Sequence, residues 1–173
     1  MKPWLLRDPY PQYGVDAPTV RPASAVMHGI DADKDRDVLV VGRDAGEFAD
    51  LGFWLKSQGM PVRYVADISL LDRIASGDEP LPGLLFVDAD SSGNLDGLID
   101  RLLLLRRARP ELPVILASVN FGRDDFDLSR ISICDASVAW PVTFTRSEVA
   151  IAMAQANNRI WQEQNGPRAP NLN

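Results

Sequence analysis

Short apolar runs alternate with amphipathic segments through the middle of the chain. Four runs rich in apolar residues, and a weaker fifth, predict β-strands over residues 38–41, 62–66, 84–87, 114–117 and 137–140. Between these runs, apolar residues recur at the spacing of an α-helix over residues 45–58, 68–75, 95–108 and 145–163. Gly59, Gly77 and Pro110 mark the ends of the first three helices.

The last predicted helix has clear helical signals, whereas the region between the fourth and fifth strands does not. The last helix carries Val149, Met153 and Ile160 on one apolar face, and either Thr145 or Ser147 is expected as its N-cap. Residues 121–135 are rich in aspartate, which disfavours a regular helix, so we expect the fourth helix to be short or irregular.

The strands point to one fold class. Strands that are apolar on both faces are typical of a parallel sheet covered by helices on each side. The alternation of strands and helices therefore predicts a five-stranded, doubly wound α/β domain over residues 37–163. Residues 1–36, a proline-rich segment, and residues 164–173 are predicted to be tails.

The charge and hydropathy of the chain exclude several classes of binding partner. A net charge of −6 argues against binding to nucleic acid or to anionic membranes, because phosphate groups are bound by concentrated lysine and arginine. The arginines of the third helix are expected to form a solvated face; they are Arg101, Arg106, Arg107 and Arg109. No run approaches the roughly 20 apolar residues of a membrane span. We expect a cytoplasmic protein.

Two single residues could carry chemistry, and both favour a structural interpretation. Cys134 is the only cysteine; we expect a buried apolar thiol rather than a reactive one. His28 has no acidic or cysteine neighbours that would complete a metal site.

Polar residues gather where the predicted strands end. The first strand ends at Gly42, the third at Asp88 with Asp90 nearby, the fourth at Ser118 and the fifth at Trp140. In an open parallel sheet, the carboxyl ends of the strands form the reactive crevice. We therefore expect any functional site to lie along this edge.

The order of these elements resembles the receiver domain of response regulators. The resemblance covers about residues 37–162 and rests on five segments: the strands at 38–41 and 84–88, the pair Asp96-Gly97, the strand at 113–118 and the pair Trp140-Pro141. It implies a flavodoxin-like fold with strand order 2-1-3-4-5. Right-handed crossovers leave few alternatives to that order.

The resemblance also assigns roles to positions of this chain. Asp88 occupies the position of the phosphoryl acceptor, and Ser118 that of the hydroxyl that binds the phosphoryl oxygen. Gly42 and Arg43 stand where the family has an acid pair for Mg²⁺, while Asp90 stands where a backbone carbonyl reaches that metal.

Two further family positions are altered. Trp140 replaces the lysine that precedes Pro141, and it is expected to fill the space that the lysine left. Ser137 replaces the aromatic residue of the family's switch. Because Mg²⁺ needs several oxygen ligands, we expect neither metal nor another cofactor, and no enzymatic activity. Arg43 is predicted to form a permanent ion pair with Asp88 instead.

Three functions compete. The first is a degenerate receiver that acts as a phosphorylation-independent protein-interaction module in signal transduction. The second is a single-domain response regulator phosphorylated on Asp88 by a histidine kinase. The third, a flavodoxin-like cofactor binder, rests only on the loop at residues 42–46, which lacks the glycine pattern of a phosphate loop.

The expected partner is another protein: a histidine kinase, an output protein or a second copy of the chain. The resemblance implies contact through the face formed by the fourth helix, the fifth strand and the last helix. Its expected residues are Ser137, Ala139, Ala150, Ala154 and Asn157.

Overall fold

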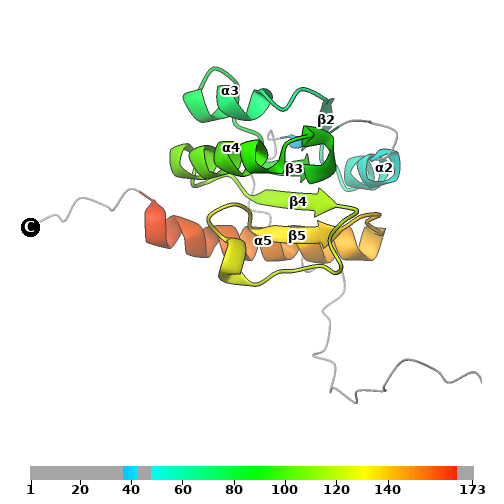
Figure 1. Cartoon of the computed structure of the whole chain (residues 1–173). Coiled ribbons are helices and arrows are strands. Elements are labelled where there is room, and N and C mark those ends of the chain that lie inside the picture. The colour runs from blue at the N-terminus through cyan, green and yellow to red at the C-terminus, as the bar shows by residue number, and fades with distance from the viewer. Residues whose placement is uncertain (1–36, 43–47, 167–173) are drawn as a thin grey trace, which may run out of the picture. The chain divides into compact units, whose positions relative to one another are not determined.

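A single parallel sheet organises the computed structural model, which describes residues 37–42 and 48–166. Its strands are β1 (Val38–Val41), β2 (Val62–Val65), β3 (Leu84–Asp88), β4 (Val114–Ser118) and β5 (Ala136–Ala139). They are hydrogen-bonded in the order β2-β1-β3-β4-β5, and every pair is parallel (Figure 1). The flavodoxin-like order predicted from the sequence is confirmed.

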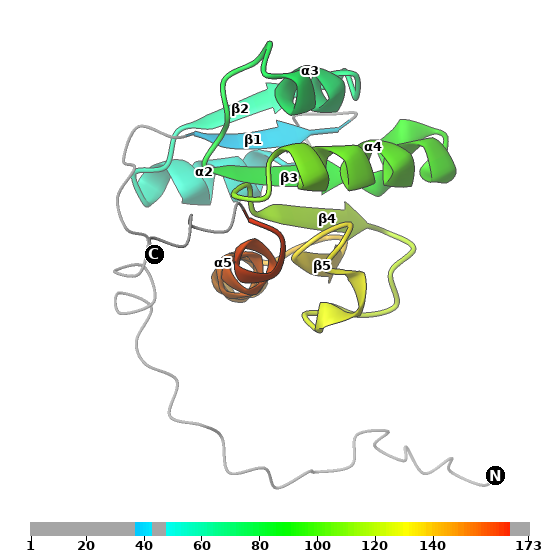
Figure 2. The same ribbon diagram turned by 90° about the vertical axis from the view of Figure 1, so that its left-hand side faces the viewer.

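Helices cover both faces of the sheet. They are α2 (Ala49–Ser57), α3 (Leu70–Ser76), α4 (Leu95–Ala108) and α5 (Phe144–Asn165), with two short 3₁₀ helices, η2 (Ala89–Ser92) and η3 (Leu128–Arg130). Figure 2 shows α3 and α4 on one face of the sheet and α2 and α5 on the other. Among the described residues, no helix combines the length and the apolar character that crossing a membrane requires.

Two apolar cores follow from the alternation of side chains along each strand. Leu39 and Val41 point toward α3 and α4, whereas Val38 and Val40 point toward α2 and α5. All four residues of β1 are buried. This two-sided burial is the reason that β1, β3 and β4 appear in the sequence as continuous apolar runs.

The predicted fourth helix is reduced to η3, as its aspartates suggested. Asp125 and Ser137 exchange backbone hydrogen bonds of 2.8 Å in an antiparallel bridge, so this segment lies along the free edge of β5. Asp124 adds an ion pair to Arg146 of α5, which holds the pKa of that carboxyl below its ordinary value. The segment that replaces the helix is thus tied to both β5 and α5.

Two predictions about α5 are wrong. Its N-cap is Thr143, and Ser147 lies inside the helix with its hydroxyl donating to the Thr143 carbonyl at 3.0 Å. The apolar residues Val149, Met153 and Ile160 do not form the core face, since Val149 is 46% exposed. The buried side of the helix is instead made of Ser147, Ala150, Ile151, Ala154, Asn157, Asn158 and Trp161. Its first three turns bury the small residues Ser147, Ala150 and Ala154, whereas its last turns bury larger, mostly polar side chains.

The prediction that the arginines of the third helix are solvated is wrong for Arg106. Its side chain is completely buried and forms a bidentate pair with the equally buried Asp135, at 2.8 and 2.7 Å. The Asp135 carboxylate also accepts a hydrogen bond from the backbone N–H of Val114, at 2.8 Å. Burial raises the pKa of Asp135 to about 6, which still leaves the carboxylate ionised at neutral pH.

Further groups surround the buried guanidinium. It donates to the carbonyls of Leu112 and Ile131, both at 3.0 Å, and lies 4.9 Å from the centre of the Trp161 ring. The indole N–H of Trp161 donates in turn to the Arg106 carbonyl at 3.3 Å. The network therefore joins α4, the beginning of β4 and α5 at the amino edge of the sheet.

Replacing Arg106 by methionine should lower the free energy of unfolding by about 3–5 kcal/mol, because it leaves the Asp135 carboxylate buried without a counter-charge. Urea unfolding followed by circular dichroism measures this loss. Arg107→Met is the matched control on the exposed side of the same helix and should have little effect. The double change Arg106→Met with Asp135→Asn should cost less than Arg106→Met alone; an equal or larger loss would contradict this account.

Candidate functional site

The carboxyl ends of the strands bring together most of the residues singled out from the sequence. Gly42 follows β1, Asp88 ends β3, Ser118 ends β4 and Trp140 follows β5. The parallel register pairs Asp88 with Ala117 and Ser118 with the last residue of β5. The edge is therefore continuous from β1 to β5, as expected for this fold.

Asp88 is held by the turn that comes after it. Its side chain is 8% exposed, and its Oδ1 accepts a hydrogen bond from the backbone N–H of Asp90 at 2.9 Å. The hydroxyl of Ser91 donates to the Asp88 carbonyl at 2.8 Å. Asp88 thus caps η2, and this cap fixes the orientation of its carboxylate.

Gly42 leaves no room for a side chain. A Cβ atom built on it would lie 2.9 Å from the Cβ of Asp88 and 3.2 Å from Cε2 of Phe48. Both distances are shorter than an ordinary contact between carbon atoms, which is about 3.5–4.0 Å. An acidic residue at this position, as in the family, therefore requires the neighbouring side chains to move.

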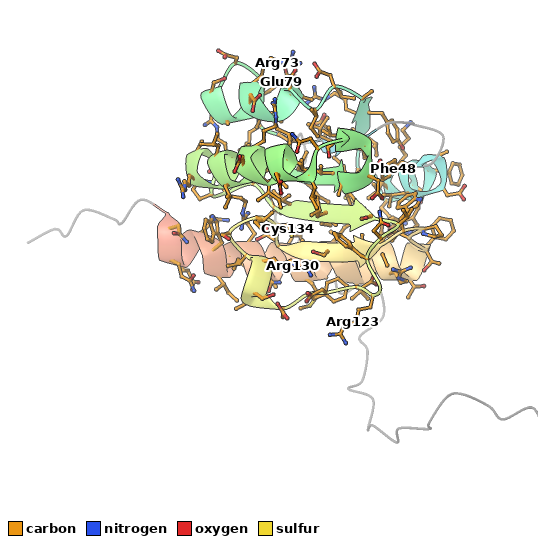
Figure 3. The ribbon with its side chains drawn as sticks, in the orientation of Figure 1. Phe48, Arg73, Glu79, Arg123, Arg130 and Cys134 are labelled. Atoms are coloured by element: carbon orange, nitrogen blue, oxygen red, sulfur yellow. The ribbon has the colours of Figure 1, made fainter. Side chains whose placement is uncertain are left out.

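An aromatic pair packs at this end of the sheet. The rings of Phe48 and Trp140 have their centroids 4.5 Å apart and are tilted by 46°, an arrangement in the favourable range for aromatic contacts. Phe48 is 2% exposed, and the backbone N–H of Trp140 donates to the Ser118 carbonyl at 2.9 Å. Figure 3 shows Phe48 at the end of the molecule where the strands of the sheet terminate. The pair places apolar surface beside Gly42 and next to Asp88.

The hydroxyl of Ser118 is bonded to Asp90. It donates to Oδ1 of Asp90 at 2.8 Å and accepts from the backbone N–H of Asn120 at 3.0 Å. The Asp90 carboxylate also accepts from the backbone N–H of Val119 at 2.7 Å and from the side-chain amide of Asn120 at 2.9 Å. Asp90 therefore ties η2 to the loop after β4.

Sequence reasoning missed this role, since it gave Asp90 only a backbone function. The available signal was the position of a short acidic side chain two residues after a strand end. Residues of that type commonly bind neighbouring backbone N–H groups.

The position of the family's aromatic switch is filled by a small buried residue. Ser137 is 2% exposed; its hydroxyl lies 3.4 Å from the sulfur of Cys134 and 3.3 Å from Nη1 of Arg130. Burial also raises the pKa of the Cys134 thiol, which keeps it in its unreactive neutral form. The expectation of a buried structural cysteine agrees with this placement, seen beside Arg130 in Figure 3.

Some expectations fall outside the part of the chain that the structure describes. Arg43 lies in the gap between residues 42 and 48, so the ion pair predicted between Arg43 and Asp88 stays a prediction.

The described residues do not fit the Mg²⁺ site of the family. Within residues 37–42 and 48–166, no group of three or more histidine, cysteine, aspartate or glutamate side chains is arranged to hold a metal ion. Asp88 is a possible ligand, but the Asp90 carboxylate is bonded to Ser118, and the Gly42 position has no space for another carboxylate. Mg²⁺ prefers an octahedron of oxygen ligands, usually with one or two carboxylates among them.

The predicted interaction face needs correction. Ser137, Ala150, Ala154 and Asn157 are all buried, the most exposed of them at 5%. The amide of Asn157 donates to the carbonyls of Phe126 and Asp135, at 2.9 and 2.7 Å. These four side chains cannot contact a partner, because those of α5 face the interior and the segment beside β5 covers Ser137. The fifth predicted residue, Ala139, is half-buried.

Comparisons with solved structures agree with the observed fold, whereas comparisons of the sequence find no match. No protein-family model matches the sequence, and no curated protein sequence matches it significantly. Solved structures do match. A response regulator from Thermotoga maritima is 17% identical with a TM-score of 0.54, over 70% of this chain and 98% of the other. A response regulator receiver domain protein from Clostridium thermocellum is 19% identical with a TM-score of 0.52, over 72% and 96%.

A third similar structure has a different description. It is a protein from Burkholderia pseudomallei named as pilus assembly-related, which is 17% identical with a TM-score of 0.54, over 73% of this chain and 93% of that one. At these identities the likeness concerns the fold alone. The chain therefore has the flavodoxin-like architecture found in response regulator receiver domains.

Replacing Gly42 by alanine should lower the free energy of unfolding by about 1–3 kcal/mol, the usual cost of forcing an extra group into a packed site. Thermal and urea unfolding measure the difference. Gly122→Ala is the matched control, because a Cβ there meets no atom within 4 Å. If both alanine variants are as stable as the wild type, the close packing around Gly42 is not what excludes a side chain.

Proposed function

We propose that this protein is a degenerate receiver that acts in signal transduction as a protein-interaction module, without phosphorylation of Asp88. The receiver-like fold supports a role in signalling, where similar structures occur. The altered carboxyl edge supports the absence of phosphoryl chemistry. The module works by presenting a fixed surface to a protein partner.

One observation carries the proposal: the space for the family's metal-binding acid is closed. The packing of Gly42 against Asp88 and Phe48 excludes a side chain, and therefore a second carboxylate, next to the acceptor position. Phosphoryl transfer to an aspartate depends on cations that neutralise the charge of the transferring group. With one metal-binding carboxylate excluded, this source of stabilisation is weakened.

The remaining parts of the family's site support the same proposal. The Ser118 hydroxyl donates to Asp90, so it is already engaged when no phosphoryl group is present. Trp140 stands in place of a lysine and packs against Phe48, so the cation that would meet a phosphoryl oxygen is replaced by an apolar ring. Each of these features lowers the affinity of the site for a dianionic group.

Incubation with acetyl phosphate or beryllofluoride and Mg²⁺ should leave the protein unchanged. Intact-mass spectrometry is expected to show no added phosphoryl group, and the tryptophan fluorescence should not respond to beryllofluoride, because the metal has too few carboxylate ligands. Asp88→Asn is the control and should behave like the wild type in both measurements. Stoichiometric labelling that Asp88→Asn abolishes would instead support a working response regulator.

A further inference from the structure

The outer side of α5 carries a row of apolar and small residues. We call this row the α5 stripe; it consists of Val149, Ala152, Met153, Ala156 and Ile160. Val149 is 46% exposed and the other four are half-buried. With about 100° of rotation per residue, the five fall within one arc of the helix. The side chains that face the sheet lie on the opposite side.

Two charged residues accompany the stripe along one flank. Glu148 is half-buried beside the first turn of the stripe, and Arg159 is exposed beside its last turn. Within the described part of the chain, neither residue has an ion-pair partner, although Arg146 on the same helix pairs with Asp124. The helix thus presents Glu148 and Arg159 at opposite ends of one flank of an apolar surface, and the exposed Glu163 follows the last residue of the stripe.

Four of the five stripe residues are placed symmetrically about its centre, whereas the position opposite Ala152 is the buried Asn157. Val149 and Ile160 are equally far from the point between Ala154 and Gln155, and Met153 and Ala156 are placed symmetrically about the same point. A two-fold axis beside that point would superpose the stripe on an antiparallel copy of itself. Glu148 of one helix would then lie within about 3 Å, measured along the axis, of Arg159 of the other, given a rise of 1.5 Å per residue.

We propose that this face pairs two copies of the chain through an antiparallel contact between their α5 helices. In such an isologous interface, a residue that contacts a second residue of the other copy is matched by the reciprocal contact. Val149 packs against Ile160 of the second copy, and Glu148 pairs with Arg159 of the second copy at both ends. Ala152 and Ala156 are small enough to let the two helices approach closely.

Charge complementarity favours a second copy in this orientation. In a parallel pair related by a two-fold axis along the helices, the charged flanks of the two copies would lie on opposite sides of the contact, and no charge would meet a partner across it. The antiparallel pair places both flanks on the same side, so Glu148 of each copy lies beside Arg159 of the other, and opposite charges in contact are favourable. This inference rests on the proposed function, because it identifies the protein partner of the proposed interaction module as a second copy of the chain. The pairing itself can be measured without a signalling assay.

Sedimentation equilibrium of the full chain should show a dimer that dissociates on dilution. Val149→Glu should weaken the dimer by at least about tenfold, because it buries a charge in an apolar contact. Leu104→Glu is the matched control: Leu104 is an exposed leucine of α4, on the other face of the sheet, and its change should leave the dimer intact. Circular dichroism checks that both variants are folded.

A charge exchange tests the orientation. Glu148→Arg and Arg159→Glu should each weaken the dimer, because each change places like charges opposite one another. Mixing the two variants should restore association as a mixed dimer, which native mass spectrometry can identify by its mass. A wild type that stays monomeric at all concentrations, equal effects of Val149→Glu and Leu104→Glu, or no mixed dimer would each overturn the proposal.

The two proposals can fail separately. A dimer that forms only with acetyl phosphate and Mg²⁺, and that Val149→Glu still disrupts, would support the pairing and contradict phosphorylation-independent function. Monomers under every condition, with Asp88 unlabelled, would overturn the pairing and leave the proposed function in place.

Discussion

The buried ion pair between Arg106 and Asp135 is the constraint on which the arrangement of the second half of the chain depends. A guanidinium with no exposed surface is tolerated only where a carboxylate and further acceptors surround it. That requirement fixes the residues that supply those acceptors, including the carbonyls of Leu112 and Ile131. Because Trp161 lies over the guanidinium and bonds to the Arg106 carbonyl, the C-terminal half of α5 is fixed by the same pair.

The ion pair also affects the carboxyl ends of β4 and β5. Asp135 holds the beginning of β4 through Val114 and directly precedes β5, so the register of these two strands is set at their amino ends. The register then determines that Ser118 and Trp140 end side by side, where the Trp140 ring meets that of Phe48. The space at Gly42 is closed by Asp88 and by Phe48, a residue of the apolar core on the α2–α5 face.

Local patterns in the sequence predicted the regular elements, whereas contacts between distant residues could not be predicted. The bounds of β1 and α4 agree with the prediction because their periodicity and end signals are unambiguous. The burial of Arg106 escaped prediction, since its partner lies 29 residues away and an arginine on a helix is usually solvated. At the site, parallel topology predicted which residues share an edge, but the contact of Phe48 with Trp140 depends on side-chain directions that only tertiary packing decides.

The elements around β5 bear on the proposal that this protein presents a fixed surface. A switch requires an element with two arrangements of similar free energy. Here Ser137 is held by a backbone bridge to Asp125, and Arg146 is bonded both to Asp124 and to the carbonyl of Ala139, at 2.7 Å for the latter. A rearrangement of β5 would break these bonds together. The free energy that such a movement requires rises with each bond, which favours a single arrangement of β5.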